Sequence, residues 1–147
     1  MAYTPWGMLC GMVSIRRGAL AALALILAST LAACSPAESG PVAFDGSHVS
    51  STRFADAVAV DGVVVIDVRT PAEYAEGHLP DAVNIDVSDA GFDAAIAELD
   101  PAGDYAVYCR SGSRSRAAVD RMAAAGVERT VGLEGGIGAW AGDVVVG

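Results

Sequence analysis

A cysteine followed by a short polar segment is the strongest chemical signal in this sequence. Cys109 comes directly after the stretch 104–108 and directly before the polar stretch 110–115, which leads into an alanine-rich stretch. In a strand–loop–helix arrangement, the loop's N–H groups can turn toward the sulfur, and the positive end of the helix points at the same place. Both effects favour the thiolate over the thiol. A thiolate held in this way is a nucleophile that can also receive an anionic substrate.

Arginines gather around this cysteine. The chain has nine arginines, no lysine and eighteen acidic residues, for a formal net charge of −9. Three of the arginines, Arg110, Arg114 and Arg116, lie within seven residues of Cys109. We expect Arg110 and Arg114 to favour the thiolate and to attract an anion, whereas Arg116 and Arg121 are expected on a solvated helix face. The acidic balance excludes broad phosphate neutralisation, so no nucleic acid partner is expected.

The elements that would position the cysteine follow from residue patterns. Apolar and β-branched runs predict strands, and capped stretches with apolar residues three or four apart predict helices. The predicted strands are 63–68, 82–85, 104–108 and 129–133, and the predicted helices are 51–59, 71–76, 91–99 and 115–125, with a short turn at 136–140. This alternation predicts a small α/β domain with a mainly parallel sheet flanked by helices. Cys109 would lie beyond the carboxyl end of a strand, where such sheets form their sites.

The first part of the chain is typical of a secretory signal. Arg16 and Arg17 precede the apolar run 19–28, which is about half the ~20 residues that a membrane-spanning helix needs. The run ends at Leu31-Ala32-Ala33-Cys34, which resembles the lipobox of bacterial lipoproteins. That resemblance implies that Cys34 is acylated after cleavage and anchors an extracytoplasmic domain to a cell membrane. A retained signal anchor, or an ordinary signal peptide with a chance cysteine, is the alternative.

These features predict three parts of the chain. A lipoprotein signal peptide occupies 1–33, an acylated cysteine with a flexible tether occupies 34–47, and the α/β domain occupies 48–147. Residues from 34 onward retain seven arginines and all eighteen acidic residues, a net charge of −11. Cys109 then becomes the free thiol of a domain in an oxidising compartment. A buried, inert cysteine is the alternative, and a reactive one must be reachable from solvent.

Three sequence blocks resemble those of rhodanese-like domains, in the same order along the chain. They span 67–85 (DVRTPAEYAEGHLPDAVNI), 109–115 (CRSGSRS) and 133–140 (LEGGIGAW). The resemblance implies a sulfurtransferase that carries a sulfane sulfur as a persulfide on Cys109. Thiosulfate or another persulfide would donate the sulfur, and cyanide, a thiol or a protein would accept it. The resemblance implies no metal and no organic cofactor.

The resemblance also implies roles for the loop that follows Cys109. Its amides would hold the transferred anion, and Arg110 and Arg114 would draw thiosulfate. The substrate-binding residues would be Arg110, Ser111, Gly112, Ser113, Arg114 and Ser115. Phosphatase relatives have one more residue in this loop and an arginine at its seventh position. Here the seventh position is Ser115, so phosphatase and arsenate reductase chemistry rank below sulfur transfer.

Other polar residues are expected to have structural roles. Asp67 and Arg69 flank a strand end and could support the site, but an internal ion pair or a hydrogen bond to the loop is preferred. Glu73 is expected to pair with Arg69, four residues away. His78 is expected to anchor a turn, since its spacing to His48 matches no metal site.

Two alternatives to small-molecule sulfur transfer stay open. A tethered sulfur-relay or redox module would pass the persulfide to a partner protein and turn over small molecules poorly. A non-catalytic binding domain on the same fold would have no need of a reactive Cys109.

Overall fold

A five-stranded sheet forms the centre of the computed structural model, which describes residues 40–147. The predicted signal segment 1–33 and Cys34 lie outside the described residues, so the predicted domain boundaries stay predictions. No helix within 40–147 is long and apolar enough to cross a membrane. The elements are β1 (His48–Val49), α1 (Ser51–Val58), β2 (Val64–Asp67), α2 (Pro71–Glu76), β3 (Val83–Asn84), α3 (Phe92–Ala97), β4 (Tyr105–Tyr108), α4 (Ser113–Ala124), β5 (Thr130–Leu133) and the 3₁₀ helix η1 (Gly136–Ala139).

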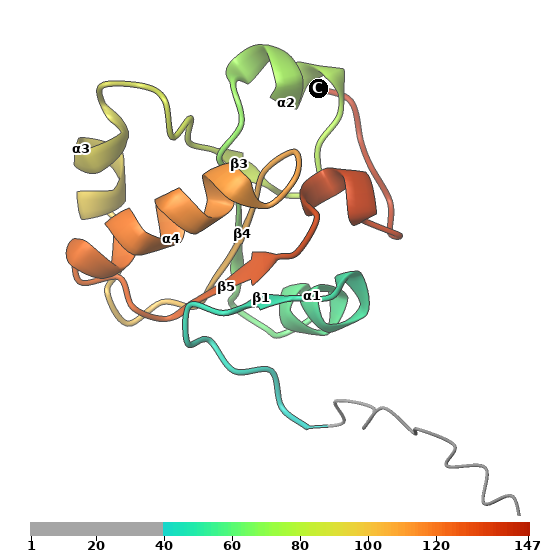
Figure 1. The fold of residues 1–147 in the computed structure, drawn as a ribbon, viewed down its shortest axis with the longest axis horizontal. Helices are drawn as coiled ribbons and strands as arrows, with labels where there is room; N and C mark the ends of the chain where they lie inside the picture. The colour runs from blue at the N-terminus through green and yellow to red at the C-terminus, as the bar shows by residue number, and fades with distance from the viewer. Residues whose placement is uncertain (1–39) are drawn as a thin grey trace, which may run out of the picture. The chain divides into compact units, whose positions relative to one another are not determined.

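The sheet is parallel throughout (Figure 1). Its strand order is β1-β5-β4-β2-β3, so β4 lies at the middle. β2 and β4 run in register from Val64 opposite Tyr105 to Asp67 opposite Tyr108. All four residues of β4 are buried, as expected of a strand that is covered on both faces. The predicted α/β fold with a mainly parallel sheet flanked by helices is confirmed.

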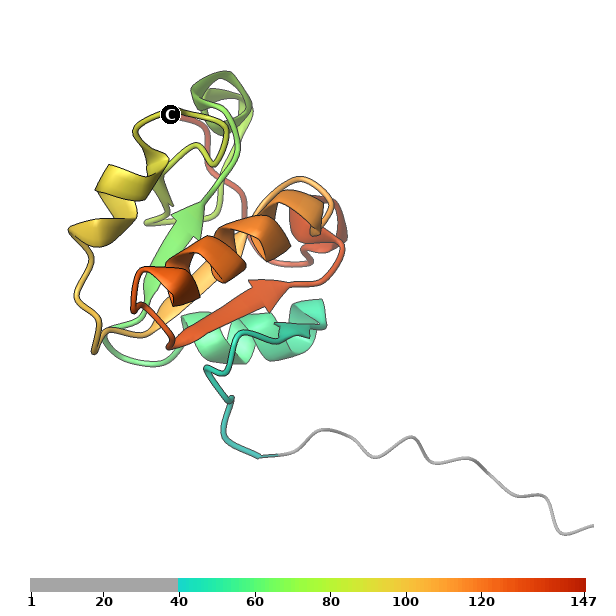
Figure 2. The ribbon, with the colours of Figure 1, turned by 60° about the vertical axis from the view of Figure 1, so that its left-hand side comes forward.

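Helices cover both faces of the sheet (Figure 2). Alternate residues of a strand point to opposite faces, and β4 divides its side chains accordingly. Val107 and Cys109 pack with Met122 of α4 in one core cluster, whereas Ala106 packs with Phe54 of α1 in the other. Cys109, which directly follows β4, therefore lies on the face that α4 covers.

The start of α4 and the presence of β1 differ from the prediction, and both have local causes; the other predicted elements differ from the structure by at most two residues at an end. α4 begins at Ser113 instead of Ser115, because Gly112 has a φ of 92° and turns the chain into the helix two residues earlier. β1 was not predicted, since two residues are too few to show a periodic pattern. It pairs with β5 and forms one edge of the sheet.

Candidate active site

Cys109 lies directly after the carboxyl end of β4, where the loop that leads into α4 begins. Its sulfur accepts a hydrogen bond from Gly112 N at 3.1 Å, and the Ser115 hydroxyl oxygen lies 3.7 Å from it. The exposed fraction of Cys109 is 0%. The expectation that solvent reaches this thiol is therefore wrong for this conformation, because the loop closes over the sulfur as its N–H groups turn inward.

Hydrogen-bond donors around Cys109 set the charge on its sulfur. Burial raises the pKa of the Cys109 thiol, since a charged group loses its water. Hydrogen bonds from the backbone of Ser115, Ser111 and Gly112 and from the Ser115 hydroxyl outweigh burial, so the pKa is lowered overall. The predicted cradle of loop amides at a helix start is thus formed. The main lowering causes are amide and hydroxyl donors, whereas the prediction also assigned this effect to arginines.

The segment after β5 holds the loop in shape. Ile137 N donates to Cys109 O at 2.8 Å, and Gly138 N donates to Arg110 O at 3.3 Å. These carbonyl groups therefore face η1, which leaves the loop's N–H groups free to face the sulfur. Gly136 lies so close that a Cβ there would overlap the Cys109 carbonyl and the Arg110 main chain. Glycine is required at this position because no side chain fits.

The two arginines predicted to receive an anion have different surroundings. Arg114 forms a two-pronged ion pair with Glu73, with N–O distances of 2.6 and 2.7 Å. Arg110 is exposed and, among residues 40–147, forms no ion pair. The predicted pairing of Glu73 with Arg69 is wrong, because Glu73 caps α2 through Thr70 and turns toward Arg114. Within 40–147, Arg110 therefore has no counter-charge, whereas Arg114 is already paired with a carboxylate.

Asp67 and Arg69 form the predicted internal ion pair at the end of β2. Arg69 Nη2 donates to Asp67 Oδ2 at 2.6 Å and to Gly77 O at 2.6 Å. The exposed fractions of Asp67 and Arg69 are 0% and 6%. Asn84 Nδ2 donates to the carbonyls of both residues, at 3.0 and 2.8 Å. The pair therefore ties the ends of β2 and β3 to the turn after α2 and positions the helix that carries Glu73.

The chain matches the family model described as Rhodanese-like domain over residues 50–143. It belongs to the rhodanese-like domain family. A protein named Sulfurtransferase from Allochromatium vinosum is 38% identical over 95 residues, 65% of this chain and 84% of that protein. The Thiosulfate sulfurtransferase GlpE of Pseudomonas entomophila is 30% identical over 84 residues, 57% of this chain and 75% of that protein. A crystal structure of a rhodanese-related protein from Thermoplasma volcanium is 30% identical, covers 68% of this chain and 98% of that chain, and has a TM-score of 0.58.

In this rhodanese-like domain, Ser111 and Gly112 act on the Cys109 sulfur through their backbone. Ser111 and Ser113 are exposed. Arg116 is exposed, as predicted, and its Nη1 donates to Gly112 O at 3.2 Å. Arg114 and Ser115 lie in the first turn of α4, so their positions are set by the helix and not by a flexible loop.

Two further predictions on the rhodanese-like domain have opposite outcomes. His78 anchors a turn, as predicted: its Nδ1 lies 3.0 Å from Tyr74 O, and its ring stacks on the Tyr74 ring. Arg121 is partly exposed, but it is more than the solvated residue predicted, because its Nη2 pairs with Asp93 Oδ1 at 2.7 Å and its guanidinium lies 4.3 Å from the centre of the Phe92 ring.

Residues that the sequence reasoning missed lie next to the loop. Glu73 was expected to face Arg69, and its contact with Arg114 spans 41 positions of sequence. His48 had no assigned role, yet its Nε2 lies 2.9 Å from the Ser115 hydroxyl oxygen, 67 positions away. A histidine within an unpredicted two-residue strand carries no pattern from which this contact could be found.

The Asp67→Asn substitution is expected to lower the free energy of unfolding by about 3–5 kcal/mol, because it leaves the buried Arg69 guanidinium without its counter-charge. Asp56→Asn is the matched control, since Asp56 pairs with Arg53 at the surface and such pairs contribute about 0–1 kcal/mol. Urea unfolding of the three proteins measures both effects. Equal losses for the two variants would contradict the role assigned to the buried pair.

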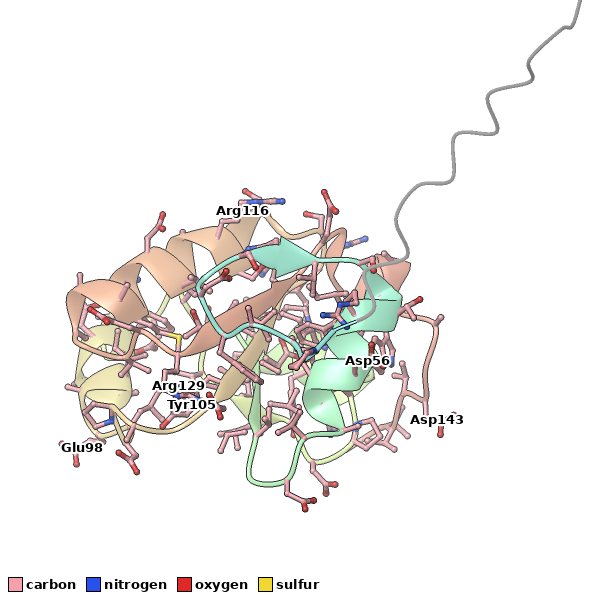
Figure 3. All side chains as sticks on the ribbon, turned by 90° about the horizontal axis from the view of Figure 1, so that it is seen from below. Asp56, Glu98, Tyr105, Arg116, Arg129 and Asp143 are labelled. Carbon is pink, nitrogen blue, oxygen red and sulfur yellow. The ribbon has the colours of Figure 1, made fainter. Side chains whose placement is uncertain are left out.

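The ion pair of Glu73 predicts a loss of stability in acid. Hydrogen bonding from Arg114 lowers the pKa of Glu73 from 4.5 to about 2. Because the folded-state pKa lies below the unfolded one, the contribution is complete above about pH 4.5 and is lost as the pH falls toward about 2. Glu73→Gln should therefore flatten the dependence of unfolding free energy on pH in this window. Glu98→Gln, at an exposed site (Figure 3), should leave it unchanged; the same dependence in all three proteins would refute the assignment.

Proposed function

We propose that this protein is a sulfurtransferase that moves a sulfane sulfur through a persulfide on Cys109, with thiosulfate or another persulfide as donor and a thiol, cyanide or a protein as acceptor. The observation that carries this proposal is the hydrogen bonding of the Cys109 sulfur by backbone amides at the start of α4. Membership of the rhodanese-like family supports it, as do the names of the Allochromatium and Pseudomonas relatives.

The reaction has two displacements at sulfur. The Cys109 thiolate attacks the outer sulfur of thiosulfate, a new S–S bond forms, the S–S bond of thiosulfate breaks, and sulfite leaves with the electron pair. The terminal sulfur of the resulting persulfide then carries the negative charge, which N–H groups around it stabilise. Cyanide attacks that terminal sulfur, the persulfide S–S bond breaks, and thiocyanate leaves as the Cys109 thiolate is restored. No net oxidation and no cofactor are involved.

The burial of Cys109 adds a requirement to this mechanism. A donor sulfur must come within bonding distance of a sulfur atom that solvent does not reach in this conformation. Arg110, Ser111 and Ser113 of the loop that follows Cys109 are exposed. We infer that this loop opens to admit the donor, a motion that loops commonly make on the microsecond to millisecond timescale.

The experiment that tests the function is an assay of thiocyanate formation. Purified protein is incubated with thiosulfate and cyanide, and a panel of further donors and acceptors identifies the preferred pair. Thiocyanate formed in proportion to protein concentration is the expected result. A folded protein that forms none, with any donor and acceptor in the panel, would overturn the proposal.

Arg110→Ala is expected to raise the KM for thiosulfate by about tenfold, since this is the exposed arginine of the loop that carries no counter-charge. Because the contact is exposed, added salt should raise the KM of the wild type and have less effect on the variant. Arg53→Ala is the control, as Arg53 lies on α1 and pairs with Asp56. Steady-state kinetics at two salt concentrations measure the KM for thiosulfate in all three proteins. An unchanged KM in Arg110→Ala would contradict this role.

Two observations favour a second candidate, a sulfur-relay module that passes its persulfide to a partner protein. The sulfur is buried, and Glu73 neutralises the charge of Arg114. A small anionic donor therefore has no open path to the sulfur in this conformation and one arginine fewer to attract it. A protein partner could supply the binding energy that opens the loop. Fast sulfur exchange with a protein persulfide, together with slow turnover of thiosulfate and cyanide, would identify this mode.

We further propose, on the sequence alone, that Cys34 is acylated and tethers the domain to the outer side of a cell membrane. A single acyl chain gives only marginal anchoring, whereas two or more on one cysteine hold a protein firmly. Metabolic labelling with a fatty-acid analogue should mark the wild type and leave Cys34→Ser unmarked. Equal membrane association of both forms would contradict the tether.

A further inference from the structure

A chain of three side chains runs from the edge strand of the sheet to the Cys109 sulfur. His48 Nε2 of β1 lies 2.9 Å from the Ser115 hydroxyl oxygen, and that oxygen lies 3.7 Å from Cys109 Sγ. Ser115 is fully buried in the first turn of α4. The chain therefore links the reactive sulfur to a titratable group outside the loop that surrounds it.

The hydrogen bonds open to the Ser115 hydroxyl depend on whether His48 Nε2 carries a proton. The hydroxyl has one proton and three neighbours: His48 Nε2, Gly112 O at 3.0 Å, and Cys109 Sγ. Gly112 O can only accept, and a thiolate can only accept. If His48 Nε2 also accepted, it would compete for the one proton of Ser115. If His48 Nε2 carries a proton, it donates to the hydroxyl oxygen, and the hydroxyl proton is left to two acceptors, Gly112 O and the charged sulfur.

We propose that His48 is a positioning residue for Cys109: its Nε2–H donates to the Ser115 hydroxyl, which in turn directs its own proton to the Cys109 thiolate. Where sulfur transfer operates, as proposed above, the same hydroxyl would stabilise the thiolate released when the persulfide sulfur leaves. The inference concerns the sulfur's ionisation, so it can be tested without any turnover.

The surroundings of His48 are built for this contact. A Cβ on Gly132 of β5 would overlap three atoms of the His48 ring, so a glycine at that position lets the imidazole lie against the sheet and reach Ser115. The ring also lines a hollow of about 370 Å³ together with Arg116 and Asp120, and Figure 3 shows Arg116 on the outer side of α4 beside β1. Solvent can therefore exchange protons with the ring.

The charged groups facing His48 come from two elements. On α4, Arg116 disfavours and Asp120 favours the imidazolium, and Glu134 after β5 favours it. Burial and Arg116 together lower the pKa of His48, which favours the neutral ring. The proposal requires this neutral ring to carry its proton on Nε2, although a backbone hydrogen bond with Gly46 also acts on the ring. The imidazolium formed in acid would add a positive charge two contacts from the sulfur. The positioning role therefore persists at neutral pH.

The test is the pH profile of Cys109 alkylation by iodoacetamide, followed at the modified peptide. His48→Leu should raise the apparent pKa of the Cys109 thiol by about one unit, which makes alkylation about tenfold slower near neutral pH. His48→Gln should restore most of the wild-type profile, because its amide N–H can occupy the Nε2 position. His78→Asn is the control at the second histidine of the chain, whose ring stacks on Tyr74, and it should match the wild type.

Each outcome of these measurements either supports or overturns the proposal. A wild-type profile in His48→Leu overturns the proposal, and so does an equal shift in His48→Leu and His48→Gln, which would indicate packing instead of proton donation. If His48→Leu does not fold, ¹⁵N NMR of the unaltered protein decides: a neutral His48 protonated on Nε2 supports the proposal, and one protonated on Nδ1 overturns it. A confirmed His48 effect in a protein that transfers no sulfur would refute the proposed function and leave this inference standing.

Discussion

The Gly136→Ala substitution is expected to destabilise the protein by at least about 3 kcal/mol and to raise the pKa of the Cys109 thiol. Two causes add. Gly136 has a φ of 61°, and a left-handed backbone costs a residue with a Cβ about 1–2 kcal/mol. The new Cβ would also overlap the Cys109 carbonyl, which no side-chain rotation can relieve. The loop must shift, and its N–H groups lose their aim at the sulfur.

Gly126→Ala is the matched control for this prediction. Gly126 has a φ of 90°, yet a Cβ there would meet nothing within 4 Å. The control therefore carries the left-handed strain without the overlap and should cost about 1–2 kcal/mol, with no change in the thiol. Urea unfolding and the pH profile of Cys109 alkylation measure the two effects. Equal outcomes for both glycines would show that η1 does not shape the loop.

The Cys109→Ser substitution is expected to reduce thiocyanate formation by at least about 10³-fold, since a serine hydroxyl stays protonated at neutral pH and does not form a persulfide. The oxygen is smaller than sulfur but can accept the Gly112 N–H, so the free energy of unfolding should change by less than about 2 kcal/mol. Turnover kinetics and urea unfolding on the same preparation separate lost chemistry from lost folding.

Cys34→Ser is the matched control among the cysteines. It removes a thiol that lies outside the domain predicted at 48–147, so thiocyanate formation should continue at the wild-type rate. Full activity in Cys109→Ser, or lost activity in Cys34→Ser with Cys109 intact, would contradict the assignment of the sulfur carrier.

The sequence predicted the sheet well where a strand is buried on both faces. β2 and β4 appear as continuous apolar runs because helices cover them on both sides, and the position of Cys109 beyond β4 followed directly. β1 could not be predicted, because an edge strand of two residues is defined by its partner β5 and not by its own pattern. The early start of α4 depends on the backbone conformation of Gly112, which composition does not reveal.

The sequence predicted the contacts of the candidate site that join residues near in sequence, and it missed those that join distant residues. The amide cradle around Cys109 is built within a few residues, and the internal pair of Asp67 with Arg69 spans two. The contact of Glu73 with Arg114 joins α2 to α4, and geometry at a capping box selected Arg114 over the sequence neighbour Arg69. Such choices are made by tertiary packing, which pair spacing along the chain does not encode.

The burial of the sulfur is the finding that most changes the sequence-based account. The arginine-rich loop predicted a solvent-exposed thiol among positive charges. In the structure the sulfur is buried, and its thiolate form is stabilised mainly by uncharged donors from Ser115, Ser111 and Gly112. In the proposed mechanism, the charge of Arg110 attracts the donor, and the amides hold the sulfur. Attraction and stabilisation are thus separate tasks, which predicts that Arg110 affects KM and that Gly136 affects the thiol itself.

Mass spectrometry of the protein after incubation with thiosulfate tests the central claim most directly. The account predicts a mass increase of one sulfur atom (~32 Da) that maps to the Cys109 peptide, disappears on addition of cyanide, and is absent from Cys109→Ser. A folded wild-type protein that gains no sulfur at Cys109 from thiosulfate or any persulfide donor would contradict it.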